Sequence, residues 1–231
     1  LSSAASDVYK RQINIEGLCM IKYLRNFCCL IRYEAKNLLN KAIIPLIIYM
    51  APTFAYSDQK VFILGDSITH GYGLAVEDGL VNQLSNWFAS AGLEVTFING
   101  GVSGDTTAGG LERLSWSLTN DLSALVVALG ANDVLRGFPP ELTRKNLSSI
   151  IDIAQSNKLP VLLIGTYAPG NYGEEYKSDF DDIFTDLAKE KNIAYIDSYF
   201  KPLLDQVSKG KDVMHLLQVD GLHPNPNGVR I

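Results

Sequence analysis

Short apolar runs recur along the chain from residue 61 onward, and each has the length of a buried strand. They cover residues 61–64, 95–98, 125–129, 161–164 and, more weakly, 193–196. Runs without polar alternation are typical of parallel strands that are covered on both faces. The pattern therefore predicts a parallel sheet of five strands.

Apolar residues at helical spacing fill the gaps between these runs. The four stripes are Leu80, Leu84, Trp87, Phe88 and Ala91; Leu111, Leu114 and Leu118; Leu147, Ile150, Ile151 and Ala154; and Phe180, Ile183, Phe184 and Leu187. We expect each stripe to be the buried face of a helix. Gly92 is a candidate C-cap of the first helix, and Asp105 is a candidate N-cap of the second. Strands that alternate with helices predict an α/β domain, a three-layer α/β/α sandwich.

The first 55 residues are predicted to lie outside this domain. Residues 2–12 read SSAASDVYKRQ and match, at eleven consecutive positions, the translation of a common transposase sequencing adapter. We therefore expect residues 1–12 to be an assembly artefact and exclude them from the interpretation of the fold.

Residues 13–55 form an N-terminal extension in which Met20 is the first plausible start. A basic segment precedes an apolar run over residues 42–51, and small residues precede a cleavage point after Ala55. This order is typical of a secretory signal peptide, and the apolar run is short for a membrane span. We expect a periplasmic or secreted protein with no stable membrane insertion after cleavage; an uncleaved anchor is the alternative. Residues 56–231 then form the folded domain, which we expect to lack a closing C-terminal helix.

The charge of the chain divides unevenly between the extension and the domain. Lys and Arg outnumber Asp and Glu by seven to three in residues 1–55, whereas the acids lead by 22 to 13 in residues 56–231. Nucleic-acid binding needs clustered Lys and Arg, so we expect no nucleic-acid partner. All three cysteines, Cys19, Cys28 and Cys29, lie in the extension. With no cysteine in the domain and only three scattered histidines in the chain, we expect no metal site and no cofactor.

Small and polar residues follow several of the predicted strands. They are Gly65-Asp66-Ser67 after the first strand, residues 99–105 after the second, residues 130–133 after the third, and Asp220-Gly221-Leu222-His223-Pro224 beyond the fifth. In an open α/β sheet the site forms outside the carboxyl ends of the strands. We therefore expect these four segments to converge on one edge of the sheet.

The converging residues are sufficient for acyl transfer. Ser67 is the candidate nucleophile, and His223 is a base that could activate it. Asp220 could fix the tautomer of His223 and stabilise the imidazolium. The backbone N–H groups of Ser67 and Gly104 and the side-chain amide of Asn132 could stabilise the oxyanion. His70, one turn beyond the nucleophile, is the rival base.

Ser67, Gly104, Asn132 and His223 match in order the four residues that name the SGNH (GDSL-type) hydrolase superfamily, and the resemblance covers roughly residues 60–228. Within the superfamily the sequence resembles the bacterial periplasmic thioesterase and lysophospholipase group. The similar stretches are residues 63–67, 103–106, 135–138 and 171–173. The resemblance implies a flavodoxin-like fold and a serine hydrolase that cleaves small-molecule acyl esters or thioesters through an acyl-serine. We expect it to act as a monomer.

The same resemblance implies that residues 134–140 form a mobile loop that closes over acyl chains; an ordinary connector is the alternative. Leu135, Phe138, Tyr167 and Pro169 are the expected substrate-binding residues. Two departures from the group bear on this site. Ala131 stands where the group has glycine and is expected to tighten the loop that holds Asn132. The different sequence of residues 166–170 bears on acyl-chain preference.

Two other functions remain open at this point. One keeps the mechanism and changes the substrate to acetylated carbohydrate, which other members of the superfamily deacetylate. The other is a non-catalytic flavodoxin-like binding module. No Gly-x-Ser-x-Gly elbow and no Gly-x-Gly-x-x-Gly fingerprint occur, which argues against an α/β-hydrolase fold and a dinucleotide site.

Overall fold

The computed structural model describes residues 59–231. The adapter-like segment, the predicted signal peptide and the three cysteines lie outside the described residues. Within residues 59–231, no helix is both long enough and apolar enough to cross a membrane.

Five parallel strands form one sheet, as the apolar runs predicted. They are β1 (Gln59–Gly65), β2 (Val95–Gly101), β3 (Ala124–Ala128), β4 (Val161–Ile164) and β5 (Ala194–Ile196). Their order is β2-β1-β3-β4-β5, which is the flavodoxin-like order. The chain moves outward from β1 in one direction to β2 and in the other to β3, β4 and β5. A crevice therefore opens beyond the carboxyl ends of β1 and β3, where the direction changes.

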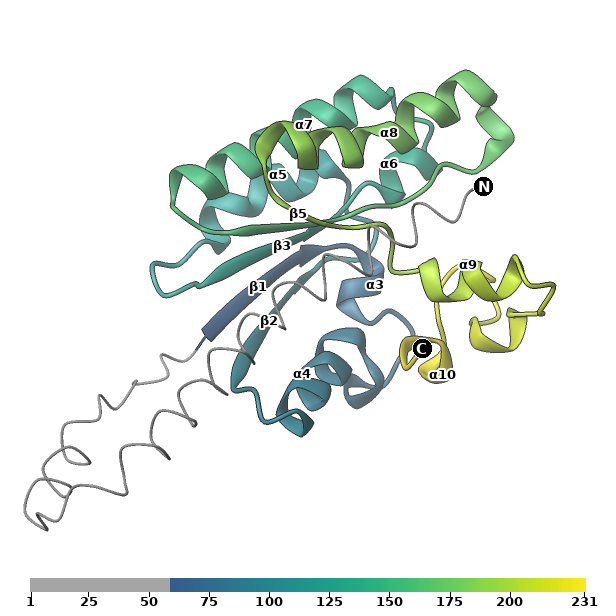
Figure 1. Cartoon of the computed structure of the whole chain (residues 1–231), viewed down its shortest axis with the longest axis horizontal. Helices are drawn as coiled ribbons and strands as arrows, with labels where there is room; N and C mark the ends of the chain where they lie inside the picture. The colour runs from purple at the N-terminus through teal and green to yellow at the C-terminus, as the bar shows by residue number, and fades with distance from the viewer. Residues whose placement is uncertain (1–58) are drawn as a thin grey trace, which may run out of the picture. The chain divides into compact units, whose positions relative to one another are not determined.

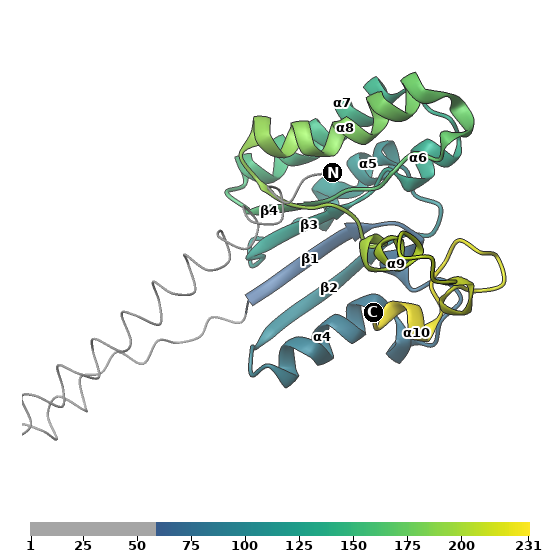
Figure 2. The same ribbon diagram turned by 45° about the vertical axis from the view of Figure 1, so that its right-hand side comes forward.

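Helices cover both faces of the sheet and confirm the three-layer fold. The α-helices are α3 (Ser67–His70), α4 (Leu80–Ser90), α5 (Thr107–Ser117), α6 (Ala131–Leu135), α7 (Pro140–Ser156), α8 (Glu174–Lys191), α9 (Lys201–Val207) and α10 (Pro226–Val229). Short 3-10 turns lie at Val76–Asp78, Gly170–Tyr172 and Met214–Leu216. Figures 1 and 2 show α5, α7 and α8 on one face and α3 and α4 on the other.

The two faces of the sheet bury very different amounts of apolar surface. Along β1, Phe62 and Leu64 join the large core cluster under α5, α7 and α8, whereas Ile63 joins a smaller cluster with Val81 of α4. The side chains of the α8 stripe, among them Phe180 and Phe184, are buried. The side packed by α5, α7 and α8 therefore holds most of the core, and burial of apolar surface is the main term that stabilises it.

Two details of the predicted helices were wrong. The side chain of Trp87 is 62% exposed, although it falls on the apolar stripe of α4. Trp87 does not belong to the smaller cluster on that face, and its ring contacts only the edge of the neighbouring Phe88 ring among the described aromatic pairs. Thr106, rather than Asp105, caps α5, because the Thr106 side chain accepts from the backbone N–H of Gly109.

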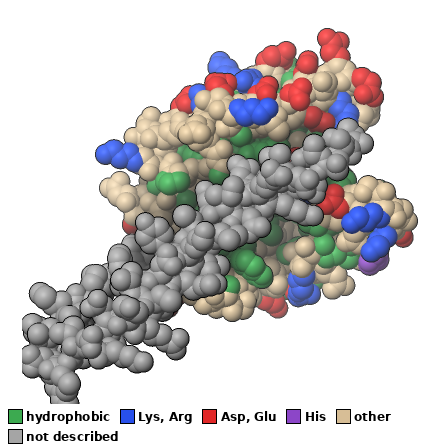
Figure 3. All heavy atoms as spheres, in the orientation of Figure 1, with side chains coloured by type: hydrophobic (Ala, Val, Ile, Leu, Met, Phe, Trp, Pro, Cys, Tyr) green, Lys and Arg blue, Asp and Glu red, His purple; other side chains and the backbone are tan. Residues whose placement is uncertain are grey.

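Acidic side chains gather on the outer surface of the upper helices in Figure 3. Seven Asp and Glu residues lie on α8 alone: Glu174, Glu175, Asp179, Asp181, Asp182, Asp186 and Glu190. This surface accounts for much of the acidic balance of residues 56–231.

Candidate active site

Ser67 lies at the point where β1 turns sharply into α3. Asp66 caps this short helix, because its Oδ1 accepts from the backbone N–H of Ile68 at 3.0 Å. The turn leaves no room for a side chain at Gly65, where an added Cβ would lie 2.0 Å from Oγ1 of Thr69. The glycine and the capping aspartate thus fix the position from which the Ser67 side chain faces the crevice.

A continuous chain of hydrogen bonds links Ser67 to a distant loop. Nε2 of His223 lies 2.7 Å from Oγ of Ser67, and Nδ1 of His223 lies 2.7 Å from Oδ2 of Asp220. His70, the rival candidate for the base, is not part of this chain of hydrogen bonds. Its Nδ1 lies 3.3 Å from the carbonyl oxygen of Gly101, and its ring faces a separate hollow beside α4. The structure therefore places His223, and not His70, against the serine.

The loop that carries His223 also holds Asp220 in its charged form. Oδ1 of Asp220 accepts from the backbone N–H groups of His223 and Leu222, at 3.0 and 2.9 Å. These bonds, that of His223 first, lower the pKa of Asp220 to about 2, since hydrogen bonds to a carboxylate favour its ionised form. The charged carboxylate can orient the imidazole and stabilise it when it takes up a proton.

Gly104 and Asn132 face the same cavity as Ser67. Gly104 adopts a φ of +80°, which disfavours residues with a Cβ. Asn132 is the second residue of α6, directly after Ala131. Nη2 of Arg136 donates to the carbonyl oxygen of Gly104 at 2.7 Å, so one side chain ties the two segments that carry the predicted oxyanion donors.

A buried polar network anchors the segment that carries Asn132. Asp133 is fully buried, and its Oδ2 accepts from the backbone N–H of Thr107 at 2.8 Å. Its Oδ1 accepts from the hydroxyl groups of Thr107 and Thr143, at 2.5 and 3.4 Å. Nδ2 of Asn146 donates to Oγ1 of Thr107 at 3.0 Å. The network joins α5, α6 and α7, because each of these helices contributes a member.

A second polar link fixes the segment that carries Gly104 to the nucleophile strand. Nε of Arg113 donates to Oδ2 of Asp105 at 2.7 Å, and Nη2 of Arg113 donates to the carbonyl oxygen of Gly65 at 3.1 Å. Asp105 directly follows Gly104, and Gly65 lies two residues before Ser67. The arginine therefore fixes the spacing between these two parts of the site.

A cavity of about 440 Å³ opens beside Ser67. It is lined by Ser67, Gly104, Asn132, His223, Leu135, Tyr167 and Pro169, all predicted from the sequence. Val134 and Thr166, from the two segments that the sequence connected with acyl chains, also line it. Sequence reasoning missed Ile68, Tyr72, Phe200 and Leu222 as lining residues. The ring of Tyr72 lies 4.8 Å from the ring of His223. Its position five residues after the nucleophile, just beyond α3, is a signal that could have found it.

Phe138 is not among the residues that line this cavity. Two tyrosines hold the backbone of its segment: Tyr172, just before α8, and Tyr176, within α8. The hydroxyl of Tyr176 donates to the carbonyl oxygen of Phe138 at 2.7 Å, and that of Tyr172 donates to the carbonyl oxygen of Leu135 at 3.2 Å. Leu135 reaches the cavity, whereas the half-buried Phe138 points elsewhere.

The segment of the cavity wall that carries Tyr167 and Pro169 is also held through its backbone. The N–H of Ala168 donates to Oδ1 of Asp181 at 2.7 Å, and Nζ of Lys177 donates to the carbonyl oxygen of Ala168 at 2.8 Å. Lys177 and Asp181 also pair with each other on α8. Both polar backbone groups of Ala168 are therefore satisfied by one helix.

Within residues 59–231, no group of three or more His, Cys, Asp or Glu side chains is placed to hold a metal ion. The polar groups described at the pocket are Ser67, His223, Asp220 and the surrounding hydrogen-bond donors.

A flavodoxin-like sheet that carries this serine, glycine, asparagine and histidine at its carboxyl edge is the arrangement of an SGNH-type ester hydrolase. Residues 63–231 match the model of the GDSL-like lipase/acylhydrolase family, and the chain belongs to this family.

Known relatives and solved structures agree with this assignment. The chain is 35% identical over 171 residues to an arylesterase of Vibrio mimicus, and the alignment covers 74% of this chain and 82% of that protein. It is 33% identical over 190 residues to thioesterase 1/protease 1/lysophospholipase L1 of Escherichia coli strain K12. That alignment covers 79% of this chain and 84% of the relative. The crystal structure of AlinE4, an SGNH-hydrolase family esterase, superposes with a TM-score of 0.65 at 35% identity, over 74% of this chain and 89% of that one.

Proposed function

We propose that the protein hydrolyses acyl esters and thioesters at Ser67 through a covalent acyl-serine. The observation that carries this proposal is the pair of 2.7 Å contacts that joins Ser67 to His223 and His223 to Asp220. A serine hydroxyl is a weak nucleophile unless a base lies within hydrogen-bond reach, and here one does.

The reaction proceeds in two halves. Nε2 of His223 takes the proton from Oγ of Ser67 as the oxygen attacks the acyl carbonyl carbon. The oxyanion that forms receives hydrogen bonds from the N–H groups of Ser67 and Gly104 and from the amide of Asn132. The intermediate then collapses, and the leaving alcohol or thiol takes the proton from His223. Water, deprotonated by the same imidazole, attacks the acyl-serine and releases the acid.

The walls of the cavity favour an acyl chain over an acetylated sugar. Val134, Leu135, Pro169 and Phe200 present apolar surface next to Ser67, and apolar surface removed from water stabilises a bound acyl chain. Relatives that carry the names arylesterase and thioesterase/lysophospholipase support the same substrate class. The hydrogen-bonded serine argues against a non-catalytic binding module. The basic and apolar pattern of residues 13–55 supports export to the periplasm or secretion. We propose that the protein acts as a monomer.

Replacement of the nucleophile tests the proposal. Ser67→Ala is expected to reduce kcat for p-nitrophenyl esters on the order of 10⁴–10⁶-fold, because loss of a triad nucleophile removes the covalent route. The variant also loses labelling by a fluorophosphonate, which reacts only with an activated serine. His70→Ala is the matched control and keeps both signals. Near-normal turnover by pure Ser67→Ala protein contradicts the assignment.

A further inference from the structure

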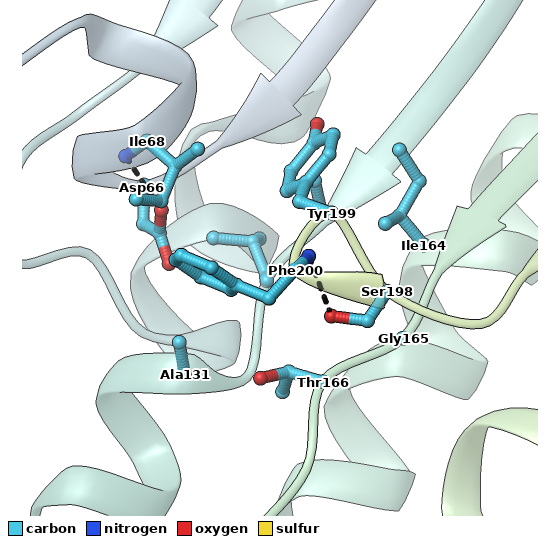
Figure 4. A pocket seen from close by; sticks show the side chains of 11 residues that line it. Asp66, Ile68, Ala131, Ile164, Gly165, Thr166, Ser198, Tyr199 and Phe200 are labelled. Carbon is cyan, nitrogen blue, oxygen red and sulfur yellow. Dashed lines mark hydrogen bonds between the residues drawn. The ribbon is translucent and has the colours of Figure 1, made fainter. Parts of the chain in front are cut away.

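A second and smaller cavity lies behind the floor of the active-site pocket (Figure 4). Ala128 and Leu129 line it from the end of β3, and Ile164 lines it from the end of β4. We call it the inner chamber. Five residues line both the inner chamber and the active-site pocket: Asp66, Ile68, Ala131, Thr166 and Phe200. The two cavities therefore share one wall.

The phenyl ring of Phe200 forms the bulk of that wall. Figure 4 shows its side chain reaching from the Ser198 side of the chamber toward Asp66 and Ile68. Its backbone is fixed at both ends: the N–H donates to Oγ of Ser198 at 3.1 Å, and the carbonyl oxygen accepts from the N–H of Leu204 at 2.8 Å. Phe200 is half-buried and belongs to neither of the two core clusters.

Most of the chamber lining is apolar and suits an apolar chain end, and Asp66, Thr166 and Ser198 add polar groups at its rim. Leu129 and Ile164 supply apolar walls, and the small side chains of Ala128 and Ala131 leave the free space. That space is about 30 Å³, comparable with the volume of one water molecule in the liquid. A chain of several methylene groups fits only if the ring no longer occupies the wall.

We infer that Phe200 is a specificity-determining residue whose ring separates the active-site pocket from the inner chamber and so limits the length of the acyl chain that is accepted. The inference rests on the proposed hydrolysis of acyl esters. Removal of the ring joins the chamber to the pocket and lets the far end of a longer acyl chain enter between β3 and β4.

The chain-length profile of Phe200→Ala tests the inference. The measured quantity is the ratio of kcat/KM for p-nitrophenyl decanoate to that for p-nitrophenyl butanoate. Each newly buried methylene group is worth about a fourfold gain, so two or three of them raise this ratio about 15- to 60-fold over the wild type. Phe200→Leu, which keeps an apolar side chain, shifts the ratio less and in the same direction.

A second substitution shows whether the chamber supplies the space. Ile164→Phe fills the chamber from the β4 side, and in the Phe200→Ala background it returns the ratio to within about threefold of the wild type. Ala128→Val is the substitute filler if Ile164→Phe does not fold. Leu204→Ala is the matched control on α9, because the exposed Leu204 side chain lines neither the chamber nor the active-site pocket, and it leaves the ratio unchanged.

Two results overturn the inference: a Phe200→Ala ratio within twofold of the wild type, or a raised ratio that neither filler lowers. Failure of the proposed function looks different, because then the wild-type protein hydrolyses neither ester.

Discussion

The two sides of the active-site pocket are held in place in different ways. On the side of Asn132, the fully buried Asp133 binds groups on α5 and α7. On the side of His223, Asp220 and His223 lie three residues apart in one loop, and both are at least partly exposed. The Asn132 side is therefore held by the buried core, whereas the His223 side is held mainly by hydrogen bonds within its own loop.

This difference separates stability from activity. A substitution at the buried side disturbs packing between three helices and the oxyanion donor at once. A substitution in the His223 loop removes a reacting group and breaks few contacts elsewhere. Mutations on the two sides therefore produce distinct combinations of lost turnover and lost stability, and these combinations test the comparison.

The largest effect is expected on the exposed side. His223→Ala removes the base that lies 2.7 Å from Oγ of Ser67, and kcat falls on the order of 10⁴-fold or more. The melting temperature changes by less than about 2 °C, because surface substitutions outside the core change stability little. Kinetics with a p-nitrophenyl ester and a thermal melt measure both quantities. A large drop in melting temperature shows that the loop supports the fold, which breaks the comparison.

A substitution on the buried side affects both quantities. Asp133→Ala leaves the Thr107 N–H and two threonine hydroxyls without their acceptor. The free energy of unfolding falls by about 4 kcal/mol, since each bond to a buried carboxylate contributes about 1.5–3 kcal/mol and part of the loss is recovered by relaxation. Turnover also falls, because Asn132 loses its anchor. Urea unfolding gives the first quantity; a loss of turnover with unchanged stability would place Asp133 in the chemistry instead.

Asp66 lines the active-site pocket between its two sides, and its contribution to the stability of the fold depends on pH. Burial raises the pKa of Asp66 to about 6 from an ordinary value of 3.8. Between these two values the folded protein holds a proton that the unfolded chain has released, so stability decreases as the pH rises from about 4 to about 6. The decrease attributable to Asp66 is about 3 kcal/mol, from roughly two pKa units.

Asp66→Asn removes this pH dependence and keeps an acceptor for the N–H of Ile68. The difference between the unfolding free energies of variant and wild type, measured by urea titration at pH 4 and pH 7, should grow with pH. A difference that is constant between these pH values contradicts the raised pKa. Asp78→Asn is a control at an exposed ion pair with Arg230.

The sequence predicted the framework of the site because acyl transfer needs particular groups at particular strand ends. A serine, a base and amide donors can serve only where the carboxyl ends of the strands meet, and this limits Ser67, Gly104, Asn132 and His223 to one edge. The five apolar runs predicted the sheet for a similar reason, since a strand covered on both faces leaves a continuous apolar signal.

The sequence did not predict which apolar side chains complete the pocket. Phe138 and Phe200 are both aromatic residues near a strand exit, yet only Phe200 lines the cavity. The difference depends on how the segments are fastened: Tyr176 holds the carbonyl oxygen of Phe138, and Ser198 holds the N–H of Phe200. Such contacts depend on the tertiary fold, so the spacing of apolar residues along the sequence does not reveal them. The exposed Trp87 was misjudged for the same reason.

The hydrogen bond between Ser67 and His223 also has a consequence during biosynthesis, because it joins residues 156 positions apart. A ribosome makes the chain from its N-terminus, so β1 to β5 and Ser67 are synthesised before His223. A nascent chain can thus fold most of its sheet while its serine still lacks a base. The catalytic pair is therefore complete only after His223 has been synthesised and has packed against Ser67.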